Sequence, residues 1–162
     1  MATGEGIRVL LVDDHVMVRQ GLRSVLQSYP NLDVVGDASD GEEAVLKVGS
    51  LRPSVVVMDI IMPKMDGIAA TRLVKIQHPQ VAVLGLSVTA HSYHVDAMLK
   101  AGAFEVVTKE KAVDDLYGAI QRAVAAIQPI LILQDAPTSP ESLTEPETLP
   151  PIDVLPIKDS KK

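Results

Sequence analysis

The run Val55-Val56-Val57-Met58-Asp59 decides the fold, because it is a short apolar stretch that ends in a carboxylate. A second run, Ile7-Arg8-Val9-Leu10-Leu11-Val12, ends in the acidic pair Asp13-Asp14. Such continuous apolar runs are typical of strands buried on both faces of a parallel sheet. Two of them would crowd carboxylates at one sheet edge, where like charges repel by roughly 1 kcal/mol per pair in water and more at lower dielectric. We expect a divalent cation with hard oxygen ligands to compensate this charge.

Five apolar segments, each followed by a stretch with helical spacing, recur along the chain. The predicted strands are Ile7–Val12, Asp33–Asp37, Ser54–Met58, Val81–Leu86 and Phe104–Thr108. The last helical stretch has the clearest apolar stripe, which runs from Val113 to Ile127. Turn residues fall at the element boundaries. This alternation predicts an α/β domain, a doubly wound five-stranded parallel sheet with right-handed crossovers.

Composition excludes several classes of protein. The 162 residues include 15 basic and 21 acidic side chains, a net charge of −6, without a basic cluster. Direct nucleic-acid binding is therefore disfavoured. The absence of cysteine excludes a disulfide framework, a thiol nucleophile and a thiolate metal site. The polar start 1–6 does not resemble a secretory signal, and no apolar run approaches the ~20 residues that cross a membrane. We expect a cytoplasmic protein with no membrane partner.

The character of the chain changes after Ile127. Residues 128–162 hold seven of the eleven prolines, with scattered Ser, Thr and acidic residues. We therefore divide the chain into an N-terminal extension, 1–6, a domain, 7–127, and a Pro-rich acidic tail or linker, 128–162. The favoured interpretation is a mostly disordered tail. The alternative is that an apolar patch, Ile130–Leu133 or Ile152–Leu155, adds a strand to a sheet edge.

Five polar side chains are predicted to meet at one edge of the sheet. In an open parallel sheet, ligands bind outside the carboxyl ends of the strands. Asp13 and Asp14 follow the first strand, and Asp59, Ser87 and Lys109 follow the third, fourth and fifth. Taken singly, each has a plainer explanation: an acid that caps the first helix, a loop serine or a solvated lysine. Capping needs only one acid, and all five residues fall on the same edge.

In this order and spacing, the motifs resemble the receiver domain of two-component response regulators over roughly residues 6–127. The matching pieces are Leu11-Val12-Asp13-Asp14-His15, Met58-Asp59-Ile60-Ile61-Met62-Pro63-Lys64-Met65-Asp66-Gly67, Leu86-Ser87, Ala101-Gly102-Ala103 and Lys109. The resemblance implies a flavodoxin-like receiver fold with strand order 2-1-3-4-5. The pair Asp66-Gly67 is better explained as turn and cap chemistry than as part of a site.

The resemblance also implies a role for each site residue. Asp59 would accept a phosphoryl group from a sensor histidine kinase or a phosphotransfer protein. Asp14 and Asp59 would bind Mg²⁺ directly, Asp13 would act through water, and the backbone carbonyl of Ile61 would supply a further oxygen. His15 would be a neighbour and not a ligand. Ser87 and Lys109 would contact phosphoryl oxygens. Such a domain is not an enzyme with a separate substrate, although it promotes its own phosphorylation and the hydrolysis of its acyl phosphate.

The chemistry has an independent physical reason. A carboxylate that attacks an anionic phosphoryl group needs its own charge and that of the donor masked, and Mg²⁺ does both. The resemblance implies that phosphorylation then switches the surface of the fourth helix, fifth strand and fifth helix to control a downstream effector protein. Relatives often form homodimers through this surface.

Two residues depart from the family pattern. Val106 stands where many receivers have an aromatic residue that swings inward, and neither Phe104 nor Tyr117 is an evident replacement. Glu110 follows Lys109 where many receivers have proline. An acidic residue at this position resembles the subgroup that is attached to helix-turn-helix domains, yet the tail does not resemble such a domain.

Three other functions fit parts of the sequence. The alternative function is a degenerate receiver that binds partners without phosphorylation. A flavin-nucleotide carrier shares the sheet, but Asp13-Asp14 would repel a phosphate after the first strand. A phosphatase with an aspartyl nucleophile would place a second acid two residues after the first, and Asp13-Asp14-His15 lacks that spacing.

Overall fold

The computed structural model describes residues 5–134, in which five strands alternate with five helices. The strands are β1 (Ile7–Val12), β2 (Leu32–Ala38), β3 (Val55–Asp59), β4 (Ala82–Ser87) and β5 (Glu105–Thr108). The helices are α1 (Val16–Gln27), α2 (Gly41–Leu51), α3 (Gly67–Gln77), α4 (Tyr93–Ala101) and α5 (Ala112–Gln134). Every predicted strand is present, and its ends differ from the prediction by one residue at most.

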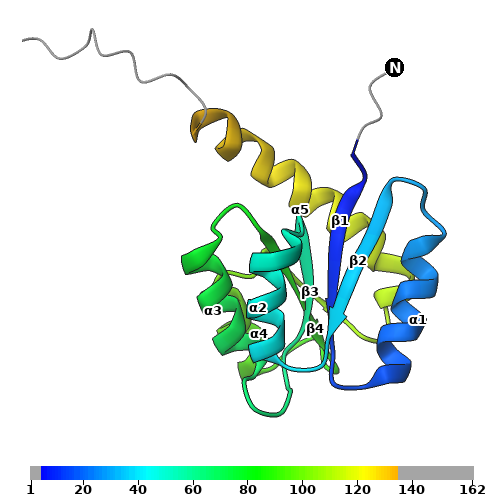
Figure 1. Ribbon diagram of the computed structural model, residues 1–162. Helices are drawn as coiled ribbons and strands as arrows, with labels where there is room; N and C mark the ends of the chain where they lie inside the picture. The colour runs from blue at the N-terminus through cyan, green and yellow to red at the C-terminus, as the bar shows by residue number, and fades with distance from the viewer. Residues whose placement is uncertain (1–4, 135–162) are drawn as a thin grey trace, which may run out of the picture.

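The five strands form one parallel sheet in the order β2-β1-β3-β4-β5. Helices α1 and α5 cover one face, and α2, α3 and α4 cover the other (Figure 1). Because both faces are covered, every residue of β3 and β4 is buried, whereas the edge strands β2 and β5 are only partly buried. The predicted doubly wound fold and strand order are confirmed.

Two apolar cores flank the sheet. Met58 and Met98 belong to the core under α2, α3 and α4, whereas Leu26 and Leu116 belong to the core under α1 and α5. All four side chains are fully buried. With a single Phe and no Trp in the chain, the cores are built from aliphatic and Met side chains, which can fill the interior densely.

The loop after β3 is fixed by a cap and by a close backbone approach. Asp66 is the N-cap of α3, and its carboxylate accepts a hydrogen bond from the N–H of Ala69 at 2.8 Å, as the turn and cap interpretation predicts. A Cβ atom on Gly67 would lie 2.0 Å from the carbonyl oxygen of Asp59. Only glycine therefore lets α3 begin so close to the end of β3, beside Asp59.

The last helix is longer than predicted. Helix α5 continues beyond Ile127, through Pro129, to Gln134. The prediction of tail structure from residue 128 is therefore wrong for 128–134, and so is the idea that Ile130–Leu133 adds a strand. Proline loses one backbone hydrogen bond and disfavours helical geometry before it, which is why it usually ends a helix. A helix already anchored over several turns can nevertheless continue past a single proline with a kink.

The second apolar patch, Ile152–Leu155, lies outside the described residues, as does the rest of 135–162. Among the helices of residues 5–134, none combines the length and the apolar character that crossing a membrane requires.

We expect Gly67→Ala to lower the free energy of unfolding by about 1–3 kcal/mol, because the added methyl group must displace the Asp59 carbonyl. Gly21→Ala is the matched control. Gly21 lies within α1, and a Cβ atom added there would have nothing within 4 Å, so alanine should stabilise the protein by roughly 0.5–1 kcal/mol. Urea denaturation measures both. Equal stability of the two variants would contradict the close approach.

Candidate functional site

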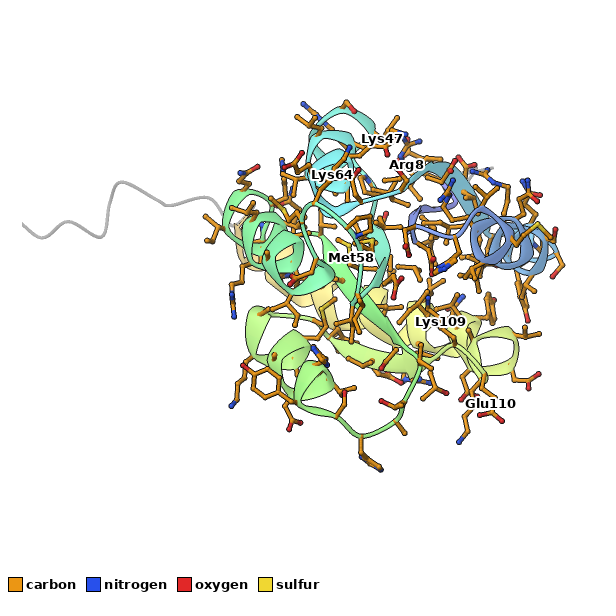
Figure 2. All side chains as sticks on the ribbon, turned by 90° about the horizontal axis from the view of Figure 1, so that it is seen from below. Arg8, Lys47, Met58, Lys64, Lys109 and Glu110 are labelled. Atoms are coloured by element: carbon orange, nitrogen blue, oxygen red, sulfur yellow. The ribbon has the colours of Figure 1, made fainter. Side chains whose placement is uncertain are left out.

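The sheet register brings the predicted site residues to one edge. Val12 pairs with Met58, so Asp13 follows beside Asp59. Asp59 in turn pairs with Leu86, the residue before Ser87. Ser87 pairs with Thr108, and the N–H of Lys109 then donates to the Ser87 carbonyl at 2.8 Å. Figure 2 looks onto this edge from below, with Lys109 among the strand ends and Glu110 toward the outside.

Four acidic or imidazole side chains meet at this edge. One potential ligand atom from each of Asp13, Asp14, His15 and Asp59 lies within 4.8 Å of the other three. Asp13 and Asp59 are buried, at 1% and 4% exposure, and Asp14 is partly buried. The three carboxylates are thus as crowded as the sequence predicts, although Asp59 is far from Asp13 and Asp14 along the chain.

The ammonium group of Lys109 lies between two of these carboxylates. Its Nζ atom is 2.8 Å from Oδ2 of Asp13 and 3.1 Å from Oδ2 of Asp59. Burial alone would lower the pKa of Lys109, but its contacts with Asp13 and Asp59 outweigh burial and raise it. Lys109 is therefore charged and bridges the ends of β1 and β3.

The Asp59 carboxyl is harder to ionise than an ordinary aspartate. Burial, followed by the charge of Asp13, raises its pKa from 3.8 to about 6. Lys109 opposes this shift, while Asp14 adds to it. A second cation beside Asp59 would favour the ionised form, which a nucleophilic carboxylate needs.

The donor set fits a hard divalent cation. Oδ2 of Asp13 and Oδ1 of Asp14 are buried and accept no well-directed hydrogen bond within residues 5–134, although nitrogen atoms of Lys109 and His15 lie 2.8 and 3.1 Å away. The Asp13–Lys109 contact is thus an ion pair without hydrogen-bond geometry. In the same part of the chain, no backbone N–H donates to the carbonyl of Ile61. Carboxylate and carbonyl oxygens are the ligands that Mg²⁺ prefers.

The acids are not simply helix caps. His15 occupies the N-cap position of α1 and makes no side-chain capping hydrogen bond. The Asp13 carboxylate instead accepts a hydrogen bond from the His15 N–H at 2.8 Å. The ring Nδ1 of His15 lies 3.1 Å from Asp14 and 3.3 Å from Asp13, and the side chain is 69% exposed. His15 is a neighbour of the acidic pair on its solvent side.

A pocket of 300 Å³ opens beside these residues and is lined by Asp59, Ser87 and Lys109. The Ser87 Oγ atom is buried and accepts a hydrogen bond from the Thr89 N–H at 3.2 Å. A larger cavity of 640 Å³ lies at the opposite edge of the sheet, near Arg8, and contains none of the site residues. Chemistry, and not cavity size, therefore identifies the site.

Sequence reasoning missed one side chain at the site. The guanidinium of Arg19, on the first turns of α1, donates to the backbone carbonyl of Asp13 at 2.5 Å. An arginine on a solvent-facing helix gives no sequence signal for such a contact, because its partner is a backbone atom that the loop conformation alone exposes.

Comparisons with known proteins identify the family to which the chain is similar. Residues 9–121 match the family model of the response regulator receiver domain. The response regulator GacA of Pseudomonas protegens is 40% identical over 119 residues, which cover 74% of this chain and 56% of that protein. The chain thus spans about half the length of the curated relatives it matches.

Two solved structures are similar as well. The response regulator domain of Thermotoga maritima CheB aligns with a TM-score of 0.70 and 32% identity, covering 74% of this chain and 97% of that one. A CheX–CheY–BeF₃–Mg²⁺ complex of Borrelia burgdorferi aligns with a TM-score of 0.64 and 28% identity, covering 72% of this chain and 91% of that one. The fold, the family match and the relatives agree, and the chain belongs to the response regulator receiver domains of two-component systems.

Proposed function

We propose that this chain is a phosphoacceptor signalling domain in which Asp59 receives a phosphoryl group from a histidine kinase or a phosphotransfer protein. The observation that carries the proposal is the position of Asp59, buried at the end of β3 with the Lys109 ammonium 3.1 Å away. The Asp59 side chain also lines the 300 Å³ pocket, so a phosphoryl group can reach it from solvent.

In the transfer step, a carboxylate oxygen of Asp59 attacks phosphorus. The new O–P bond forms as the N–P bond of the donor phosphohistidine breaks, and the bonding electron pair returns to the donor nitrogen. Lys109 neutralises charge that develops on a phosphoryl oxygen, and the Ser87 hydroxyl donates to another. Water later hydrolyses the acyl phosphate, so the domain promotes its own reset and has no separate substrate.

Mg²⁺ is the cofactor of this proposal. Asp13, Asp14, Asp59 and the Ile61 carbonyl would hold it, and the two buried carboxylate oxygens without hydrogen bonds support this assignment. When bound, it masks the charge of both the nucleophile and the phosphoryl group. The similar CheY of Borrelia burgdorferi was crystallised in a complex with Mg²⁺ and BeF₃, which supports the same metal here.

The output surface of the proposal consists of α4, β5 and α5. It carries exposed Tyr93, Leu99 and Phe104, together with a Glu105–Arg122 ion pair at 2.8 Å. Phosphorylation would bias this surface toward a form that binds a downstream effector or a second copy of the chain. A cytoplasmic location stays a prediction.

Val106 packs beside β4 and α4, at the position where the family pattern often has an aromatic residue. A Cβ on Gly85 would lie 3.0 Å from Val106 and 3.1 Å from Met98, so these side chains already fill the space beside β4. Tyr117 is engaged elsewhere, since its ring stacks on Tyr29 with 3.8 Å between centroids. Any coupling to the output must therefore differ from an aromatic rotamer change at position 106.

The degenerate-receiver alternative is less well supported. It would predict loss of one or more acceptor-site side chains, whereas the three acids and Lys109 are present and lie close together, and Ser87 lines the same pocket as Asp59 and Lys109. The flavin-carrier alternative conflicts with the carboxylates that follow β1, because a flavin phosphate there would meet two negative charges.

The first prediction concerns the acceptor itself. Incubation with acetyl phosphate and Mg²⁺ should add one phosphoryl group, and Asp59→Asn should abolish the adduct, since the amide is a poor nucleophile. The exposed Asp33→Asn variant is the control and should label as wild type does. Intact-mass analysis measures the adduct. Persistent labelling of Asp59→Asn, or no adduct in wild type at any Mg²⁺ concentration, would contradict the proposal.

The second prediction concerns Lys109. Lys109→Met should slow phosphoryl transfer about 10²-fold, because one preorganised charge at the phosphoryl oxygens is lost. The neighbouring exposed Lys111→Met variant carries the same charge change outside the site and should transfer at the wild-type rate. Single-turnover labelling measures the rate, and equal slowing in both variants would assign the effect to net charge alone.

The third prediction follows from the raised pKa of Asp59. Between pH 3.8 and about 6 the folded metal-free protein binds a proton more tightly than the unfolded chain, so the stability contribution of this group falls as pH rises through that window. At pH 8 in EDTA, Asp59→Asn should therefore have a free energy of unfolding, measured by urea denaturation, that is roughly 1–3 kcal/mol higher than that of wild type. The two proteins should converge near pH 4. A pH-independent difference would contradict the pKa assignment.

A further inference from the structure

Arg19 holds the backbone that carries the two N-terminal acids. Its side chain is only 14% exposed, although α1 lies on the surface. One terminal nitrogen donates to the Asp13 carbonyl at 2.5 Å, and Nε donates to Oδ2 of Asp37 at 2.8 Å. A planar guanidinium can make both bonds at once in a fixed direction.

The carbonyl group that accepts this hydrogen bond from Arg19 belongs to the peptide bond that joins Asp13 to Asp14. The N–H of Asp13 is still bonded to the Ala38 carbonyl of β2 at 3.1 Å, but β1 ends at Val12. Beyond that point the sheet offers the Asp13 carbonyl no partner, and α1 begins only at Val16. The Asp13 N–H is bonded to β2 and its C=O to Arg19, so the backbone of Asp13 is held on both sides. The orientation of this peptide determines the direction in which the backbone continues to Asp14.

Asp37 anchors Arg19 in this orientation. Asp37 lies near the end of β2, and its other carboxylate oxygen accepts from Arg23 at 3.1 Å. Arg19 and Arg23 are one helical turn apart on α1 and share this carboxylate. Of these two arginines, only Arg19 also has a hydrogen bond to Asp13 within residues 5–134. Two arginines of the same helix thus have the same ion-pair partner and differ in one bond to the site.

We propose that Arg19 is a positioning residue that aims the carboxylates of Asp13 and Asp14 at the cation site by fixing the peptide between them. This rests on the proposed function in that Mg²⁺ is taken as the cation. Arg19 touches neither the cation nor the phosphoryl group in this role, and it acts through the Asp13 backbone. Replacing a residue that orients a metal ligand through a hydrogen bond typically lowers the metal affinity 10–100-fold.

The test is a Mg²⁺ titration of the full chain by isothermal calorimetry, with no phosphodonor present. Arg19→Gln should weaken Mg²⁺ binding about 10-fold or more, whereas Arg23→Gln should stay within about twofold of wild type. Both variants lose one positive charge and one of the two ion pairs to Asp37. Arg19→Lys keeps the charge but cannot make both bonds in fixed geometry, and it should weaken binding several-fold.

A second readout needs no metal and reports on the Asp13 turn itself. The His15 N–H donates to Asp13 Oδ1 within the same turn. Its hydrogen exchange, measured by NMR on the folded proteins, should accelerate in Arg19→Gln and Arg19→Lys and not in Arg23→Gln. Urea midpoints of all variants separate this local effect from global loss of stability.

The outcomes distinguish this inference from the proposed function. Equal weakening in Arg19→Gln and Arg23→Gln, or a wild-type affinity in Arg19→Lys, would overturn it, because charge and not geometry would then be responsible. Wild-type protein that takes up no Mg²⁺ would overturn it too. Labelling at saturating Mg²⁺ tests the other proposal separately: Arg19→Gln should regain wild-type labelling there. Wild type that binds Mg²⁺ but accepts no phosphoryl group would refute the acceptor role while the Arg19 comparison stands.

Discussion

One ammonium group permits three carboxylates to share the carboxyl edge of the sheet. Lys109 contacts Asp13 and Asp59 at 2.8 and 3.1 Å, and without it two buried negative charges would face each other in a region of low dielectric. Bringing these groups together constrains other elements of the fold. Strand β5 must lie beside β4 so that Lys109 arrives at this edge, and α3 must start at a glycine so that it can pack against the Asp59 carbonyl.

The same interaction leaves the site short of positive charge. A single lysine does not neutralise the cluster, as the raised pKa of Asp59 and the carboxylate oxygens without hydrogen bonds both indicate. An arrangement of this kind costs stability in the metal-free protein, and strongly perturbed groups of this type gather at functional sites. Under the proposed function, this excess negative charge is what a cation would neutralise when a phosphoryl group binds.

Short pieces of chain connect the site with the proposed output surface. Ser87 ends β4, and the loop after it leads to α4, while Lys109 is followed three residues later by the start of α5. Helix α5 then continues to Gln134, so one regular element extends from the site beyond the opposite end of the sheet (Figure 1).

The sequence by itself determined the order and type of the elements, the strand limits to within a residue, and the meeting of Asp13, Asp14, Asp59, Ser87 and Lys109. The reason is that apolar runs and turn residues are local signals, and parallel strands must end at a common edge. Only the tertiary structure decided that α5 passes Pro129, because a helix anchored by packing can tolerate a break that isolated propensity does not. It also decided which nitrogen neutralises which carboxylate, and that Arg19 reaches the Asp13 carbonyl. Such contacts depend on side-chain direction and on backbone atoms that become available only where a strand ends, and neither is written in residue type or spacing.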